Sequence, residues 1–173
     1  MTWCGVPIAG VRVLGLCGAA RHGKDQLARL LCELVPGAER FALSDGIAAF
    51  ARAHGWMTKR DPRTLQEVGW ELRQARPGAW LEVLYGAIDD RRPPLAIVTG
   101  IRFADEAALV RQMGGQLLRV VRLEADGRPF VDQDRDPAHP VERQIATLSV
   151  DAEIVARSGD LEALRAAAQR FAA

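Results

Sequence analysis

The sequence has little cysteine, little net charge and no long apolar run. Its three cysteines, Cys4, Cys17 and Cys32, are too few and too irregularly spaced for a disulfide framework or a zinc site. The formal net charge of +1 gives no general attraction to nucleic acid or to an acidic membrane. No stretch approaches the roughly 18 apolar residues of a membrane span, and the first ten residues lack the plan of a signal peptide. We therefore expect a cytoplasmic protein with neither a membrane nor a nucleic-acid partner.

The composition is that of a soluble globular protein. Apolar residues make up 49% and charged residues 26% of the 173 residues. A chain of this length is most simply one domain, and it is long enough to bury a good core. The sequence contains no internal repeat and no low-complexity segment.

The most informative motif lies near the N-terminus. An apolar, strand-like run over 11–17 leads into Gly18-x-x-x-x-Gly23-Lys24, and a helical pattern follows directly. This is the context of a phosphate-binding P-loop, in which backbone N–H groups and the lysine face an anion at the helix N-terminus. Asp25 departs from the pattern, because a Ser or Thr that holds magnesium usually follows the lysine. The alternative is a glycine-rich turn that only joins a strand to a helix.

Strands alternate with helices along the chain. The pattern predicts strands over 11–17, 40–42, 95–99, 116–123 and 152–156, and helices over 24–35, 44–53, 63–76, 79–89, 103–113, 140–147 and from 160 onward. Such alternation predicts a parallel sheet covered on both faces, with ligands bound beyond the carboxyl ends of the strands. The loop 18–25 and the turn 99–102 both follow strands, so we expect them to face one crevice.

Arg102 lies just past the second of these strand ends. Thr99 and Gly100 supply no carboxylate there for a metal ion. A cation at a helix start is unfavourable by the helix dipole, which favours bidentate phosphate binding over a surface position for Arg102.

A second polar group falls on the helix predicted over 63–76. The spacing of Arg63, Gln66 and Arg73 places the three residues on one helical face, where they could hold the phosphate and base of a nucleotide. A solvated helix face is the alternative reading of the same spacing.

The segment 124–138 is rich in Asp, Arg, Pro and Gly and is predicted to be a mobile loop or lid. Closing lids bring arginines to a transferring phosphoryl group, because charge and positioning stabilise that transition state. Arg128, Arg135 and Arg143 flank this segment, and one of them is expected to act. His22 is expected to be exposed at the tip of the glycine-rich loop.

Taken in order, these motifs resemble the bacteriophage deoxynucleoside monophosphate kinases, within the P-loop kinase superfamily. The loop 18–25 carries Gly-Lys-Asp, as that family does, in place of Gly-Lys-Ser/Thr. The segments 63–73, 101–106 and 139–142 are similar to the family's substrate-side helix, its Asp-Val-Arg-Phe-x-x-Glu turn and its C-terminal part. The resemblance covers nearly the whole chain.

The resemblance implies a three-layer α/β fold of the P-loop kinase type, with a mostly parallel sheet. It implies one kinase domain over 1–173, with a helical insertion for the monophosphate at about 44–92 and a lid at about 124–143. The implied reaction transfers the ATP γ-phosphoryl group to a deoxynucleoside monophosphate, with Mg²⁺ as a cofactor. The implied origin is a phage or prophage, and a homodimer stays open.

The resemblance also implies the site residues. The ATP-binding set is Gly18, Ala19, Ala20, Arg21, His22, Gly23, Lys24, Asp25 and Gln26. Lys24, Asp25 and Arg102 would be catalytic, with Asp25 placing the magnesium ion directly or through water. The acceptor or the transferred group would be held by Arg63, Gln66, Arg73 and Arg102.

One position departs from the family. Its turn carries an aspartate where this chain has Gly100. Either Asp25 suffices for the metal, or Asp45, Asp105 or Glu106 stands in, or activity is reduced or lost.

Three other functions stay open. Animal-type phosphomevalonate kinases share a Gly-Lys-Asp loop and a related arginine turn. Some phage kinases phosphorylate a hydroxymethylated base in DNA, although the neutral overall charge argues mildly against a DNA substrate. A nucleotide-binding protein with impaired catalysis is favoured by Gly100, whereas such a protein has no physical need to keep Lys24 and Arg102.

Overall fold

The computed structural model describes residues 6–59, 61–132 and 140–173. Within these residues one sheet has the strand order β2-β3-β1-β4-β5, and each neighbouring pair is parallel. Its strands are β1 (Arg12–Cys17), β2 (Glu39–Ala42), β3 (Leu95–Ile101), β4 (Gln116–Leu123) and β5 (Ala152–Arg157). The helices are α1 (Lys24–Leu34), α2 (Leu43–Ala53), α3 (Pro62–Ala75), α4 (Ala79–Arg91), α5 (Ala104–Gln112), α6 (Pro140–Thr147) and α7 (Leu161–Ala172).

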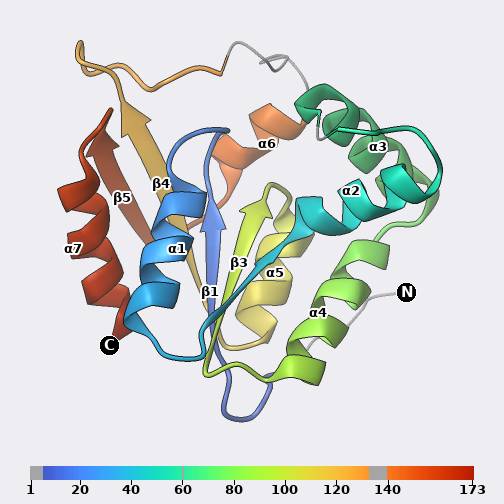
Figure 1. Ribbon diagram of the computed structural model, residues 1–173, viewed down its shortest axis with the longest axis horizontal. Coiled ribbons are helices and arrows are strands. Elements are labelled where there is room, and N and C mark those ends of the chain that lie inside the picture. The colour runs from blue at the N-terminus through green and yellow to red at the C-terminus, as the bar shows by residue number, and fades with distance from the viewer. Residues whose placement is uncertain (1–5, 60, 133–139) are drawn as a thin grey trace.

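The sheet is the middle of three layers. Strands that are buried on both faces read as continuous apolar runs, and β1 and β3 have that character. Val13 and Cys17 of β1 join a buried cluster with α4 and α5, whereas Leu14 and Leu16 join one with α1 and α7. Figure 1 shows these two helix pairs on opposite sides of the sheet. The predicted three-layer α/β fold is therefore confirmed.

The helices α2 and α3 pack on each other through a cluster separate from the sheet cores, although Leu43 at the start of α2 belongs to the core that covers β1 and β3. Their separate cluster contains buried Ala48, Ala51, Leu65 and Val68, together with Met57. Figure 1 shows both helices beyond the sheet edge toward which the strand arrows point. The helix α4 differs, since its Leu81, Leu84 and Ile88 belong to the core that covers β1 and β3. The stretch 44–92 thus combines a two-helix unit and a helix anchored on the sheet.

The predicted strands and helices are all present, with small shifts at their ends. The strand β3 runs to Ile101 instead of ending at Thr99, because Ile101 still pairs with Cys17 after a register shift. The helix predicted over 103–113 begins at Ala104, since Phe103 has an extended backbone and caps it.

Candidate active site at the carboxyl edge of the sheet

The loop between β1 and α1 is a tight turn lined by backbone. Gly18 has a φ of +128°, and a Cβ atom there would lie 2.3 Å from the carbonyl oxygen of Val120. Gly23 caps α1 in the left-handed region and has no side chain to cover the first N–H groups of the helix. The Nζ of Lys24 folds back and donates to the carbonyl oxygen of Ala19 at 2.5 Å. Backbone N–H groups and a lysine at a helix start form an arrangement suited to an anion.

A cavity of about 340 Å³ lies beside this loop. The residues that line it come from the P-loop region, the end of β3 and the two-helix unit. Among them are Ala20, Arg21, Lys24, Asp25, Gln66, Trp70, Arg73, Trp80, Thr99, Gly100, Arg102, Phe103, Glu106 and Asp132. The expectation that the loop 18–25 and the turn 99–102 face one crevice is confirmed.

The structure gathers some of the predicted site residues at this cavity and leaves others outside it. Of the substrate-side residues, Gln66, Arg73 and Arg102 line it, whereas Arg63 is exposed and does not. Of the predicted ATP-binding residues, Ala20, Arg21, Lys24 and Asp25 line it. The others stand elsewhere in the loop or the first turn of α1: Gly18, Ala19, His22, Gly23 and Gln26.

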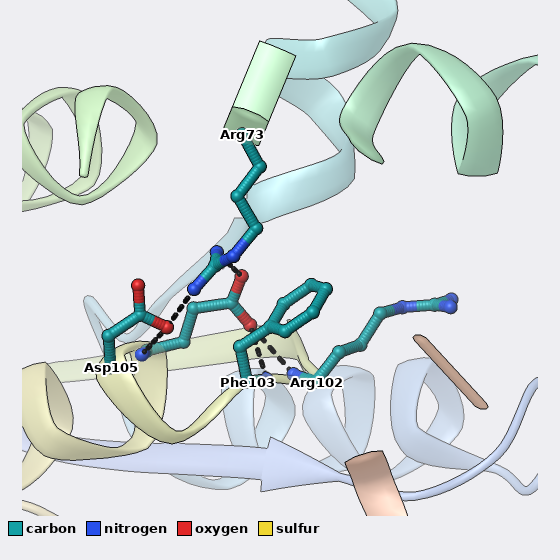
Figure 2. A network of polar contacts seen from close by, with 5 residues as sticks. Arg73, Arg102, Phe103 and Asp105 are labelled. Carbon is teal, nitrogen blue, oxygen red and sulfur yellow. Dashed lines mark hydrogen bonds and ion pairs between the residues drawn. The ribbon is translucent and has the colours of Figure 1, made fainter. Parts of the chain in front are cut away.

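The guanidinium of Arg73 is held by carboxylates of α5 (Figure 2). It pairs with Asp105, and its Nη1 donates to Glu106 at 3.2 Å. Its central carbon lies 3.8 Å from the centroid of the Phe103 ring, in a cation–π contact. Arg73 therefore ties α3 to the start of α5, and an anion in the cavity would compete with Asp105 and Glu106 for it. Asp105 and Glu106 are thus both engaged by Arg73, and a part for either in holding a metal ion stays a prediction.

Glu106 shapes the turn that carries Arg102. Its Oε2 accepts hydrogen bonds from the backbone N–H of Arg102 at 2.7 Å and of Phe103 at 3.1 Å. Burial raises the pKa of Glu106 to about 7, against the opposing effects of these N–H groups and of Arg73. The side chain of Arg102 itself donates to Glu142 of α6 at 2.9 Å.

Because of Glu106, we expect the free energy of unfolding to fall as the pH rises from about 4.5 to about 7. The unfolded chain releases this proton near the ordinary value of 4.5, whereas the folded protein keeps it up to about 7. The folded state binds more protons in that window, so the free energy of unfolding falls by up to about 3 kcal/mol as the pH rises. Glu106→Gln should remove this slope in urea unfolding measured across the window, and Glu67→Gln, exposed on α3, should keep it. Equal slopes in the two variants would contradict the assignment.

Asp25 pairs with Arg40, which was not among the predicted site residues. The Nη1 of Arg40 lies 3.3 Å from the carboxylate of Asp25 and donates to the hydroxyl of Thr99 at 3.2 Å. The Nη2 of the same side chain lies 3.1 Å from Asp45. Nothing in the local pattern marked Arg40, whose position on β2 beside β3 brings it to the site.

The residues present fit a magnesium ion that is carried largely by phosphates. Magnesium is commonly held through one or two carboxylates together with substrate phosphates. Asp25, in the first turn of α1 and on the cavity wall, can supply one such ligand. Across residues 6–59, 61–132 and 140–173, no group of three or more His, Cys, Asp or Glu side chains could hold a metal ion by itself.

Gly100 is the extra residue of a β-bulge. Leu16 pairs with Thr99 and Cys17 pairs with Ile101, so Gly100 has no partner in the register of β1 and β3. Its φ is +85°, a region that favours glycine. An aspartate at this position would therefore have to adopt a backbone conformation that favours glycine.

We expect Gly100→Asp to lower the free energy of unfolding by about 1–2 kcal/mol, because an L side chain is strained at this φ. A Cβ atom at this position would meet no heavy atom within 4 Å, so crowding is not the cause. Gly100→Ala is the matched control and should be destabilised to a similar extent in urea unfolding. Wild-type stability in both variants would refute the strain.

His22 is buried, so the prediction that it is exposed is wrong. It is 6% exposed, because the segment after β4 folds back over the glycine-rich loop. The Nδ1 of His22 accepts the backbone N–H of Arg122 at 3.3 Å, which leaves Nε2 to donate to the carbonyl oxygen of Phe130 at 2.9 Å. Arg21 adds an ion pair of 3.3 Å with Asp132. Residues 122–132 are thus bound to the loop instead of standing clear of it.

The expected lid arginines do not line the cavity where the structure describes them. Arg128 is exposed and pairs with Asp126 at 2.6 Å. Arg143 is exposed on α6. Arg135 lies outside the described residues.

The comparisons with known proteins identify the fold. No protein-family model matches the sequence, and no curated protein matches it significantly. The shikimate kinase of Acinetobacter baumannii, solved with shikimate, is 17% identical with a TM-score of 0.52, over 96% of this chain and 90% of that chain. The tunicamycin resistance protein of Deinococcus radiodurans is 14% identical with a TM-score of 0.52, over 96% and 94%. A sugar kinase of Janibacter is 17% identical with a TM-score of 0.50, over 92% and 93%.

These likenesses show an α/β fold of the P-loop kinase type. None of the helices in the described part of the chain has the length and apolar character that crossing a membrane requires.

Proposed function

We propose that the protein is an ATP-dependent phosphotransferase whose acceptor is a deoxynucleoside monophosphate. The observation that carries the proposal is the shared cavity, to which the glycine-rich loop contributes Lys24, the end of β3 contributes Arg102 and α3 contributes Gln66 and Arg73. A donor phosphate site and an acceptor site that open into one space can bring two phosphates into line for transfer.

In this proposal the residues of the chain act mainly by charge and position. Lys24 and the N–H groups at the start of α1 hold the donor phosphates, and Arg102 stabilises the group in transfer. A magnesium ion, when bound through Asp25, would neutralise charge on the donor phosphates. The residues that α2 and α3 contribute to the cavity would hold the acceptor. These two helices would then be part of the substrate-binding insertion of a single kinase domain.

The carboxylates of the cavity favour a phosphate acceptor over a hydroxyl. A hydroxyl acceptor calls for a carboxylate base, whereas the oxygen of a monophosphate is already an anionic nucleophile. Three carboxylates line the cavity, those of Asp25, Glu106 and Asp132. Each is paired with an arginine, so none of these three stands ready as that base. The structural neighbours include a shikimate kinase and a sugar kinase, so hydroxyl acceptors belong in the test.

The test is ADP production from Mg-ATP against a panel of acceptors. The panel contains deoxynucleoside and ribonucleoside monophosphates, phosphomevalonate, shikimate and simple sugars. Turnover on deoxynucleoside monophosphates supports the proposal. Turnover on a hydroxyl acceptor alone would contradict the proposed acceptor, but it would still support an ATP-dependent phosphotransferase. ATP binding without turnover on any acceptor would leave a nucleotide-binding protein and overturn the proposal.

A further inference from the structure

The strand β5 forms an open edge of the sheet. Within the described part of the chain it pairs with β4 on one side and with no strand on the other, and Figure 1 shows it as the outermost strand beyond β4. An edge strand carries a row of N–H and C=O groups with which another strand can pair. The edge of β5 is therefore a surface at which a further strand could be added.

Backbone hydrogen bonds at the end of β5 show which of its residues face the open edge. The N–H of Ser158 donates to the carbonyl oxygen of Leu123 at 2.8 Å, whereas the carbonyl oxygen of Arg157 accepts from the N–H of Asp160 at 2.9 Å. Because backbone groups alternate in direction along a strand, the even-numbered residues turn them toward β4 and the odd-numbered residues turn them away. Val155 thus presents its N–H and C=O to the open edge, where no hydrogen bond from another described segment reaches them.

The side chains of the odd-numbered residues form an exposed row of an acid, an apolar group and a base. Glu153, Val155 and Arg157 are all exposed, and Val155 is 48% exposed. The alternate residues Ile154 and Ala156 are buried in the cluster that joins β5 to α1 and α7, so they hold the strand in place. An apolar side chain between two opposite charges, on a strand with an open edge, is a pattern that a matching strand can complete.

The row is complementary to itself when a second copy runs antiparallel to it. A twofold axis at Val155 sets the two valine side chains opposite each other, and it sets each Glu153 opposite the Arg157 of the other copy. Opposite charges that face each other across strands stabilise the pairing, and a twofold interface makes each such contact twice. An axis at Ile154 or Ala156 would instead set Val155 opposite a charged residue. The axis at Val155 is therefore the register that the side chains favour.

We propose that this edge pairs with the same edge of a second copy of the chain, in a twofold antiparallel dimer centred on Val155. The two sheets then form one continuous sheet across the axis. The strand β5 has 6 residues, so the interface is small and we expect a dissociation constant in the micromolar range. The described wall of the cavity beside the glycine-rich loop contains no residue of β5, so this inference stands apart from the proposed function.

Charge reversal at the two ends of the row tests the pairing. Glu153→Arg would set two arginines opposite each other, and Arg157→Glu would set two glutamates opposite each other, so each variant should associate about tenfold more weakly than the wild type. An equimolar mixture of the two variants sets opposite charges against each other again, so it should recover the wild-type association. The measurement is sedimentation velocity of the full chain, over a concentration series that extends to several hundred micromolar.

Matched variants control for net charge and for folding. Glu33→Arg and Arg29→Glu reverse the charges of an exposed ion pair on α1, and each should associate as the wild type does. Glu153 lies 3.6 Å from Arg119 of β4, so circular dichroism checks that Glu153→Arg still folds. Val155→Lys leaves both charges of the row in place and sets two ammonium groups at the axis. It should be a monomer at concentrations where the wild type is a dimer.

Each outcome decides for or against the β5 interface. A wild-type dimer that weakens in each charge-reversal variant and returns in their mixture supports it. A wild-type monomer at every concentration overturns it. A dimer that all three substitutions in β5 leave unchanged also overturns it, because another surface would then hold the two copies together. A mixture that fails to recover the dimer excludes the antiparallel register centred on Val155, and the inference with it.

Discussion

Lys24→Ala is expected to lower kcat/KM for phosphoryl transfer by about 10³-fold or more, and to weaken ATP binding, without unfolding the protein. The ammonium group of Lys24 is a full positive charge at the start of α1, on the cavity wall that Arg21 of the same loop also lines. In the proposed function, its removal would leave the backbone N–H groups and Arg21 to face the donor phosphates. The fold should tolerate the change, because Lys24 is only half-buried and its Nζ donates to the carbonyl oxygen of Ala19 in the adjacent loop.

The chain offers a natural control for this variant. Its two lysines are Lys24 and Lys59, and Lys59 is exposed in the connection between α2 and α3. Lys59→Ala removes the same charge from the protein as a whole, so it should keep wild-type kcat/KM and ATP affinity. If Lys24→Ala retained more than about a tenth of wild-type activity, the loop would not be the donor phosphate site.

Local pattern was sufficient to predict most of the fold. The apolar run before Gly18, the spacing of apolar residues in α1 and the strand ending at Leu123 are each set by residues close in sequence. Parallel order followed from the alternation of strands and helices, which also placed the loop 18–25 and Arg102 at one edge. In such elements the apolar residues recur with the period of the helix or strand, so they can be recognised from the sequence alone.

The interactions at the site depend on residues far apart in sequence. Arg40 meets Asp25 and Thr99 because β2 lies beside β3, and no periodicity in the sequence marks that contact. His22 is buried because residues 122–132 return across the loop, about a hundred positions later in the chain. Polar residues can be assigned to a helix face or a strand end from sequence, but their partners are decided by tertiary packing.

Glu106 is another residue whose place in the chain could be predicted from sequence, whereas its partners could not. The sequence marked it as part of a turn motif and left it open as a metal ligand. The structure gives its carboxylate two backbone N–H groups and Arg73, in a buried setting that raises its pKa to about 7. Its role is thus to hold the Arg102 turn against α3, which is a consequence of the two-helix unit closing over the start of α5.

Gly18→Ala is expected to lower the free energy of unfolding by about 3 kcal/mol or more, the largest stability effect of any change considered for the loop. Two separate causes act at this residue. The φ of +128° strains any L side chain, and the added Cβ would lie 2.3 Å from the carbonyl oxygen of Val120, a backbone atom that cannot rotate away. Relief requires β1 and β4 to separate where Cys17 pairs with Arg119, which disrupts the sheet beside the loop.

Gly86→Ala makes the contrast that isolates these causes. Gly86 lies inside α4, where an added Cβ meets no heavy atom within 4 Å. Alanine there should raise the free energy of unfolding by about 0.5–1 kcal/mol, because it lowers the backbone entropy of the unfolded chain. Thermal unfolding of both variants should therefore move the midpoint in opposite directions, down by about 6–12 °C for Gly18→Ala. A midpoint for Gly18→Ala close to that of the wild type would mean that β4 yields easily. The tight turn would then owe its shape to Gly23 and the start of α1 rather than to the contact between Gly18 and Val120.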